Sequence, residues 1–162
     1  MVIIRPTANL AKKMKVKLVA TSNQSSTLLG DWYARDLVID RQQYILCVSE
    51  YGRLPVIFRA APYASLPMRL VTALPEVLQK IGVPIEMARV EVSKMDEVVL
   101  AKTSNRSILG SMNEFRFQLQ ASNQLGRLHD DPVKMSLDLA EVVSLVLPNH
   151  TPKDTVLKLF GK

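Results

Sequence analysis

Residues Asp31–Phe58 read D-W-Y-A-R-D-L-V-I-D-R-Q-Q-Y-I-L-C-V-S-E-Y-G-R-L-P-V-I-F and contain three apolar segments separated by the polar breaks R-Q-Q and Y-G-R. Aromatic and β-branched residues, which favour strands, dominate the three segments, and the breaks have the length of hairpin turns. We therefore predict a meander of three antiparallel strands. Because Pro55 cannot donate a hydrogen bond within a sheet, the third strand should lie at an edge or begin with a bulge.

The first of these strands divides its side chains between two faces of the sheet, because successive residues of a strand point in opposite directions. Tyr33, Arg35, Leu37 and Ile39 share one face, and Trp32, Ala34, Asp36 and Val38 share the other. Short strands are also expected at residues 2–4 and 98–103, the second of them buried because its sequence is apolar.

Helices are predicted before and after the meander, at about residues 7–15, 65–82, 84–95, 131–147 and 151–160. Thr7 can cap the first, and Gly82 is a favourable C-terminal cap for the second. Pro75 inside the second predicts a kink or two short helices. Asp131 followed by Pro132 is a typical helix start. The inward residues of that helix are predicted to be Met135, Leu139, Val142, Val143 and Val146.

Residues Lys102–Phe117, K-T-S-N-R-S-I-L-G-S-M-N-E-F-R-F, join the strand at 98–103 to one more helix. Steps of four, three and four residues predict an inward apolar stripe of Ile108, Met112, Phe115 and Leu119. The same steps give a second stripe of Arg106, Gly110, Asn113 and Phe117. Glycine weakens a helix interior by roughly 1 kcal/mol, so Gly110 suggests that another element packs close to it. Ser111 and Glu114 also fit a capping box, in which case residues 105–110 form a loop.

Together these elements predict one α+β domain over residues 1–162. Its small antiparallel sheet, the three-stranded meander plus the short strands, is covered by helices. Residues 148–162 are expected to form a peripheral C-terminal helix.

Composition excludes several classes of site. The only cysteine, Cys47, lies in an apolar run and is expected to be buried, and the two histidines, His129 and His150, have no metal-ligand spacing. No phosphate-loop, dinucleotide-binding or nucleophile-elbow motif is present, so we expect no metal and no cofactor. The apolar segments are too short to cross a membrane, and we expect a cytoplasmic protein.

The formal net charge of +6 is concentrated near the start of the chain. Residues 1–20 contain Arg5, Lys12, Lys13, Lys15 and Lys17 and no acidic residue. The four lysines are candidates for a local contact with nucleic acid. The alternative is a solvated helix face that keeps the protein soluble.

Polar and aromatic residues gather in L-G-D-W-Y (29–33), in S-E-Y-G-R (49–53) and in the N-R-S-I-L-G corner (105–110). Our first hypothesis is a non-enzymatic binding module for an anionic ligand or a protein partner, with its site between these segments. The candidate ligand-binding residues are Trp32, Tyr33, Arg53, Arg106, Ser107 and Asn113. The alternative is structural: Trp32 belongs to the core, Glu50 and Arg53 form a turn salt bridge, and Arg106 and Asn113 fix loop carbonyls.

A second hypothesis is a metal-independent nuclease or toxin-like phosphodiesterase. Glu50 would act as the base, and Arg53 and Arg106 would bind the scissile phosphate. This hypothesis requires the three side chains to share one solvent-open cleft.

Several segments resemble a family of uncharacterised small bacterial proteins, a domain of unknown function. They are I-I-R-P-T, L-G-D-W-Y-A, I-D-R-Q-Q-Y, S-E-Y-G-R-L-P-V and A-K-T-S-N-R-S-I-L-G-S-M-N-E-F, in this order over most of residues 1–125. The resemblance implies a bacterial or mobile-element origin and one domain. It supplies no catalytic residues.

Overall fold

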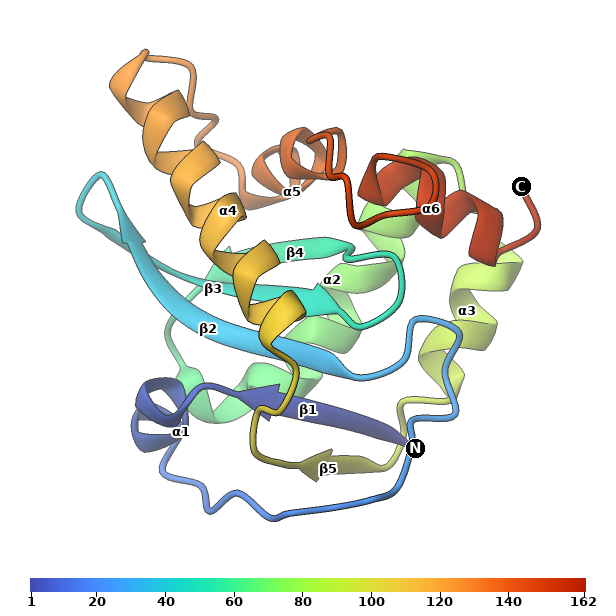
Figure 1. The fold of residues 1–162 in the computed structure, drawn as a ribbon. Coiled ribbons are helices and arrows are strands. Elements are labelled where there is room, and N and C mark those ends of the chain that lie inside the picture. Colours follow the sequence, from blue (N-terminus) through green and yellow to red (C-terminus); the bar gives the residue numbers. More distant parts are fainter.

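A five-stranded mixed sheet forms the centre of the molecule in the computed structural model, which describes residues 1–162 (Figure 1). The strand order is β4-β3-β2-β1-β5. Three of the strands, β2 (Trp32–Ile39), β3 (Gln42–Ser49) and β4 (Pro55–Arg59), form the predicted antiparallel meander. The prediction that the third strand lies at an edge is confirmed, since β4 is the last strand on its side.

The two short strands lie on the other side of β2. Strand β1 (Val2–Pro6) pairs with β2 in parallel, and β5 (Val98–Leu100) pairs with β1 in parallel. The α+β class is confirmed, and the parallel pairs make the sheet mixed rather than wholly antiparallel. As an edge strand, β5 is half-buried and not fully buried as its apolar sequence suggested.

Six α-helices surround the sheet: α1 (Ala8–Met14), α2 (Leu66–Ile81), α3 (Ile85–Ser93), α4 (Arg106–Gln124), α5 (Pro132–Ala140) and α6 (Pro152–Leu159). Their starts follow the predicted capping chemistry. The side chains of Thr7, Asp131 and Thr151 each accept a hydrogen bond from a backbone N–H of the first turn. None of the helices is both long enough and apolar enough to span a membrane.

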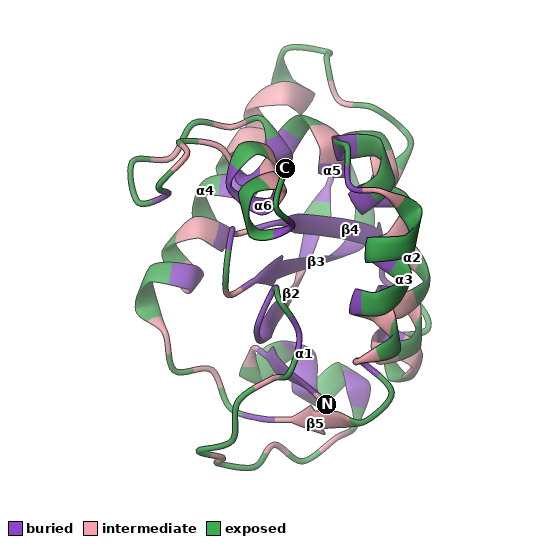
Figure 2. Cartoon of the chain, turned by 90° about the vertical axis from the view of Figure 1, so that its right-hand side faces the viewer, coloured by how far each residue is buried: buried purple, intermediate pink, exposed green.

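The sheet carries a separate apolar cluster on each face, as the alternation in β2 predicts. Trp32 and Ala34 face α1, α2 and α3, whereas Tyr33 and Leu37 face α4. The four predicted inward residues of α4 are all buried in the second cluster. The burial pattern places the sheet strands at the centre, with the exposed faces of the helices outside (Figure 2). Cys47 is buried, which raises the pKa of its thiol.

Two helix predictions need correction. The helix from Pro132 ends at Ala140 instead of Leu147, and Val143 and Val146 are exposed at 68% and 63%. The chain turns back there, since the Ser144 N–H donates to the His150 carbonyl at 2.6 Å. Pro75 does not divide the helical region, because α2 continues through it. A short 3₁₀ turn, η1 (Tyr63–Ser65), comes before α2.

The last helix, which the sequence suggests is peripheral, buries Val156 and Phe160 in the first cluster. It packs against the turn between β3 and β4. Gly52 in that turn has φ +82°, and a Cβ atom there would lie 2.6 Å from Cγ2 of Val156. Any side chain at this position would strain the backbone and force Val156 of α6 to move.

We predict opposite effects on stability for two glycine substitutions. Gly52→Ala should destabilise the protein by at least about 1–2 kcal/mol, through its left-handed backbone and the contact with Val156. Gly110→Ala should stabilise it by about 0.5–1 kcal/mol, because a Cβ at this helical position meets nothing within 4 Å. Urea denaturation of both variants and the parent protein measures the two changes. Equal effects of the two substitutions would contradict this account of Gly52.

Candidate functional site

The junction between the sheet and α4 is fixed by two buried side chains on neighbouring strands. Arg5 of β1 pairs with Asp31 at 2.8 Å and donates to the Lys102 carbonyl at 2.5 Å. The hydroxyl of Tyr33 accepts from the Asn105 N–H at 3.1 Å and lies 3.2 Å from Oγ of Ser104. Tyr33 is therefore occupied in positioning the helix start.

The corner at Asn105–Gly110 is helical, not a loop. Oδ1 of Asn105 accepts from the N–H groups of Ser107 and Ile108 at 2.9 and 3.2 Å, so α4 begins at Arg106. The alternative start at the Ser111–Glu114 capping box is therefore excluded. The inference that another element packs close to Gly110 is wrong, because the space beside it is open.

The segment S-E-Y-G-R (49–53) contacts both the N-R-S-I-L-G corner, through Arg53, and the segment L-G-D-W-Y (29–33), through Glu50. Its Nη2 donates to Oγ of Ser107 at 3.1 Å, and Oε1 of Glu50 accepts from the Asp31 N–H at 3.2 Å. Burial lowers the pKa of Arg53, and the nearby Glu50 opposes this shift. The hollow beside Arg53 holds only about 30 Å³, roughly the share of one water molecule. Neither Glu50 nor Arg106 lines it, so this hollow does not form the shared cleft that a scissile phosphate requires.

Trp32 does not lie at this junction. Its side chain is completely buried on the opposite face of the sheet, within the cluster that packs on α2. No face of the indole is open to a ligand, so the structural alternative describes this residue. The reason is the strand alternation itself, which turns Trp32 away from the face that carries Tyr33 and α4.

A larger polar hollow of about 440 Å³ lies on the other flank of α4. It forms where β2 extends past the end of β1, whose last residue, Pro6, is paired with Ala34. From there the chain turns into α1, which lies alongside the rest of β2. The residues that line the hollow come from α1, β2 and α4: Thr7, Asn9, Arg35, Asp36, Leu37, Val38 and Arg116.

Two guanidinium groups line this hollow. Arg35 donates from Nη1 to Oδ1 of Asn113 at 3.0 Å and from Nε to the Asp36 carbonyl at 3.3 Å, which fixes its orientation. Burial lowers the pKa of Arg35, and the positive charge of Arg116 lowers it further. Neither arginine has a carboxylate oxygen within 4 Å, since the five ion pairs of the molecule involve other residues. Despite this pKa shift, the Arg35 guanidinium remains charged at neutral pH.

The nearest carboxylate, that of Asp36, is already paired with another cation. Its Oδ2 accepts from Nζ of Lys13 at 2.5 Å and from Nδ2 of Asn9 at 3.0 Å. Burial raises the pKa of Asp36, but the hydrogen bond from Lys13 and further favourable interactions outweigh burial and lower it overall. Asp36 is thus ionised and bound to Lys13. Its charge also attracts Arg35 and partly opposes the lowering of the Arg35 pKa, but neither arginine forms an ion pair with a carboxylate.

Paired guanidinium groups of this kind bind phosphate or carboxylate, because their planar arrays of N–H donors match two oxygens of the anion. Of the predicted ligand-binding residues, only Asn113 takes part, as the partner of Arg35; of the predicted nucleic-acid contacts, Lys13 takes part as the partner of Asp36. The sequence did contain one signal for this site. Arg35 is a charged residue within an otherwise apolar stripe of β2, on the face that must lie under α4.

The basic N-terminal segment carries less free charge than its sequence indicates. Arg5 is buried against Asp31, and Lys13 is paired with Asp36. Lys12, Lys15 and Lys17 are exposed. Three of the five cations therefore remain available for a contact with nucleic acid.

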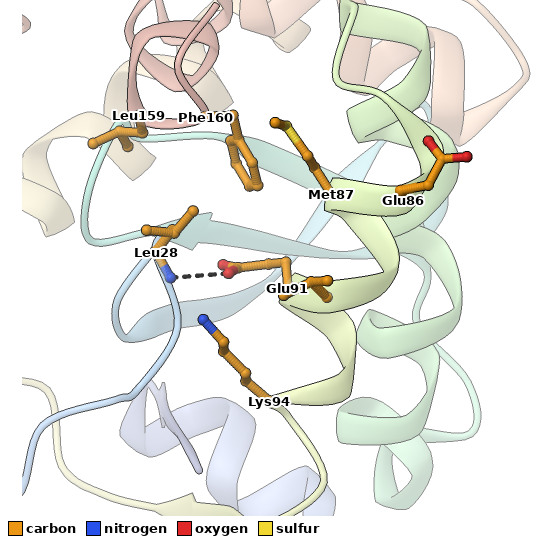
Figure 3. Close-up of a pocket in the computed structure, with 8 residues that line it drawn as sticks. Leu28, Glu86, Met87, Glu91, Lys94, Leu159 and Phe160 are labelled. Atoms are coloured by element: carbon orange, nitrogen blue, oxygen red, sulfur yellow. Dashed lines mark hydrogen bonds between the residues drawn. The ribbon is translucent and has the colours of Figure 1, made fainter.

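A second hollow, of about 290 Å³ and mainly apolar, lies between α3 and α6 (Figure 3). Leu28, Met87 and Phe160 are among the residues that line it. Glu91 is buried in its wall, where the two carboxylate oxygens accept from the N–H groups of Leu28 and Leu29, each at 2.9 Å. Glu91 therefore fixes a loop to α3.

Comparison with known proteins identifies one family. The model of a domain of unknown function (DUF6933) matches residues 3–155. No curated protein and no solved structure is significantly similar to the chain.

We predict that two arginines with different surroundings respond differently to substitution. Arg116→Gln removes a charge that repels Arg35, so the free energy of unfolding should stay within about 0.5 kcal/mol of the parent value or rise slightly. Arg5→Met leaves Asp31 buried without its cation and should cost about 3–5 kcal/mol. Chemical denaturation checks both. A large loss of stability with Arg116→Gln would show that this arginine has a structural role.

The Lys13–Asp36 pair should make stability depend on pH. Because the folded-state pKa of Asp36 is lowered, its contribution is fully present above the unfolded pKa of about 3.9 and is lost as the pH falls through the folded pKa. Asp36→Asn should therefore reduce the free energy of unfolding at pH 7, by less than about 1 kcal/mol, and the difference should vanish in acid. Denaturation series at several pH values test this. A difference that persists unchanged in acid would exclude the ionic contribution.

Proposed function

The chain belongs to the DUF6933 family, and we propose that it acts as a non-enzymatic binding module for an anionic ligand. The proposed site is the polar hollow between α1, β2 and α4. The observation that carries the proposal is the pair Arg35 and Arg116, two guanidinium groups that line one hollow without a carboxylate partner.

An anion in the hollow would remove an unfavourable interaction. Arg35 and Arg116 repel each other, and burial already disfavours the charged form of Arg35. A phosphate or carboxylate between them would accept hydrogen bonds from both and neutralise part of their charge. Asn113 supports this role, because its Oδ1 accepts from Nη1 of Arg35 and orients the guanidinium group. Nε donates to the Asp36 carbonyl, and Nη2 makes no hydrogen bond within the protein.

The residues around the hollow are poorly suited to catalysis. Asp36 is the only carboxylate that lines it, and a lowered pKa makes a weak proton acceptor. The nuclease hypothesis receives less support at its own position, where Arg53 lines a hollow too small for a phosphate and Glu50 accepts from a backbone N–H. A binding role agrees better with both observations.

Contact with nucleic acid is a further role for the basic segment. Lys12, Lys15 and Lys17 lie on or just after α1. Asn9 of this helix and its N-cap Thr7 line the hollow. A polyanion could therefore extend from the arginines toward these lysines. Its affinity would decrease steeply with salt and depend on the three lysines.

We expect inorganic phosphate or sulfate to bind at the hollow. In a two-dimensional NMR titration, the largest shifts should come from backbone amides of residues 35–38 and from the side chains of Arg35 and Arg116. Arg116→Gln should weaken binding roughly tenfold or more, since a charge-assisted hydrogen bond contributes about 1.5–3 kcal/mol.

Arg106→Gln is the matched control. It removes the same charge from an exposed position of the same helix but does not touch the hollow, so it should change the affinity less than twofold. Equal losses in the two variants would mean that the anion responds to net charge only. Binding that depends on Arg106 and not on Arg116 would place the site at the start of α4.

A further inference from the structure

We infer that the ligand of the polar hollow is a phosphorylated polyol, such as a sugar phosphate. This inference rests on the proposed function, because its phosphate group would occupy the position between Arg35 and Arg116. The additional information comes from the rest of the lining. The hollow offers hydrogen-bond acceptors as well as cations, and the acceptors come from α1 and β2.

Asp36 has unused capacity to accept hydrogen bonds. An ionised carboxylate can accept about four. Oδ2 of Asp36 accepts from Lys13 and Asn9, Oδ1 has a long contact of 3.3 Å with Asn9, and the backbone N–H of Asp36 itself interacts with the carboxylate, so about one acceptor position remains. Its charge is balanced by Lys13, so the remaining capacity suits a neutral donor such as a hydroxyl group.

Asn9 and Thr7 add further polar groups on the same side. Asn9 donates its amide N–H to Asp36, which leaves its carbonyl oxygen directed elsewhere and without a hydrogen-bond partner within the protein. The hydroxyl of Thr7 accepts a long hydrogen bond of 3.4 Å from Leu10 and retains its own proton as a donor. Hydroxyl groups of a ligand can both donate and accept, and therefore match this mixed set.

The size and the composition of the hollow limit the ligand further. Its volume of about 440 Å³ corresponds to roughly fifteen water molecules at about 30 Å³ each, more than a free phosphate ion fills. The lining contains no aromatic side chain, so a nucleobase would have no ring on which to stack. Leu37 and Val38 are its only apolar residues. A polyol with one phosphate group satisfies these conditions better than a nucleotide does.

The test compares four compounds by calorimetry or NMR titration: inorganic phosphate, ribose, ribose 5-phosphate and adenosine 5′-monophosphate. We expect ribose 5-phosphate to bind at least tenfold more tightly than inorganic phosphate. Ribose alone should show no saturable binding. Adenosine 5′-monophosphate should bind no more tightly than ribose 5-phosphate.

Variants of the residues proposed to bind the polyol can be compared with variants of the arginines proposed to bind the phosphate. Asp36→Ala should lower the ratio of the affinities for ribose 5-phosphate and inorganic phosphate toward one, because it removes the proposed acceptor of the polyol hydroxyl groups. Asn9→Ala should reduce the same preference. Because this variant keeps the Asp36 carboxylate, it replaces Asp36→Ala if that variant folds poorly. The ratio of two affinities in one variant is insensitive to a partial loss of folded protein.

The outcomes distinguish a failure of the polyol inference from a failure of the proposed anion-binding function. Equal, Arg116-dependent binding of inorganic phosphate and ribose 5-phosphate would overturn the polyol inference and leave the anion-binding function intact. A tenfold preference for adenosine 5′-monophosphate over ribose 5-phosphate would instead indicate a nucleotide ligand. If no compound binds in a manner that depends on Arg116, both the proposed function and the inference fail.

Discussion

The buried ion pair between Arg5 and Asp31 is the interaction on which the arrangement of the other elements depends. It connects β1 to the residue that precedes β2, and the same two side chains reach two further segments. Oδ1 of Asp31 accepts from the Ser25 hydroxyl at 2.7 Å, and Nη1 of Arg5 donates to the Lys102 carbonyl. A buried pair is tolerated only when such additional hydrogen bonds satisfy its remaining groups. Here they tie β1 to two points of the loop before β2 and to the segment that leads into α4.

The contact with Lys102 fixes the position of the segment that leads into α4. The position of α4 in turn determines the shape of the polar hollow beside β2. Tyr33 reinforces the same position through Ser104 and Asn105. Because α4 is held at its start and buries four apolar residues along its length, it carries Arg116 to a fixed place beside β2. The two arginines are therefore held near each other by the fold, at the cost of their mutual repulsion. A site whose charges are positioned before the ligand arrives loses little entropy on binding.

Local patterns in the sequence were sufficient to predict most of the elements. The alternation in β2 assigned Trp32 and Tyr33 to opposite faces, and the caps at Thr7 and Asp131 located two helix starts. The same kind of reasoning failed at Val143 and Val146, where a hydrophobic run resembles a helical stripe. Whether such a run continues a helix depends on whether a neighbouring element covers it, and here none does.

The proposed anion site was much harder to predict, because it depends on contacts between distant residues. Arg35 and Arg116 are separated by 81 positions, and neither belongs to a motif. The residues that did form motifs, Tyr33, Asn105 and Ser107, are used to hold the helix start. Gly110 was misinterpreted because a glycine on an exposed helix face cannot be distinguished in the sequence from one at a tight contact.

The hydrogen-bond partners of each arginine, which the sequence does not reveal, show whether its donors are used within the fold. Arg69, for example, donates to the backbone carbonyls of Arg59, Ala60 and Pro62 and lies over the ring of Phe58, so its donors are used within the fold. Arg5 is likewise satisfied by Asp31 and Lys102. An arginine whose donors meet carbonyls or carboxylates stabilises the protein and has little left to offer a ligand. Arg35 uses two of its donors, on the Asp36 carbonyl and on Asn113, and Arg116 lies close enough to repel it. An added anion would accept hydrogen bonds from the remaining donors and reduce this repulsion. Two of the chain's positive charges thus line one polar hollow of about 440 Å³, and this arrangement is the basis of the proposed anion site.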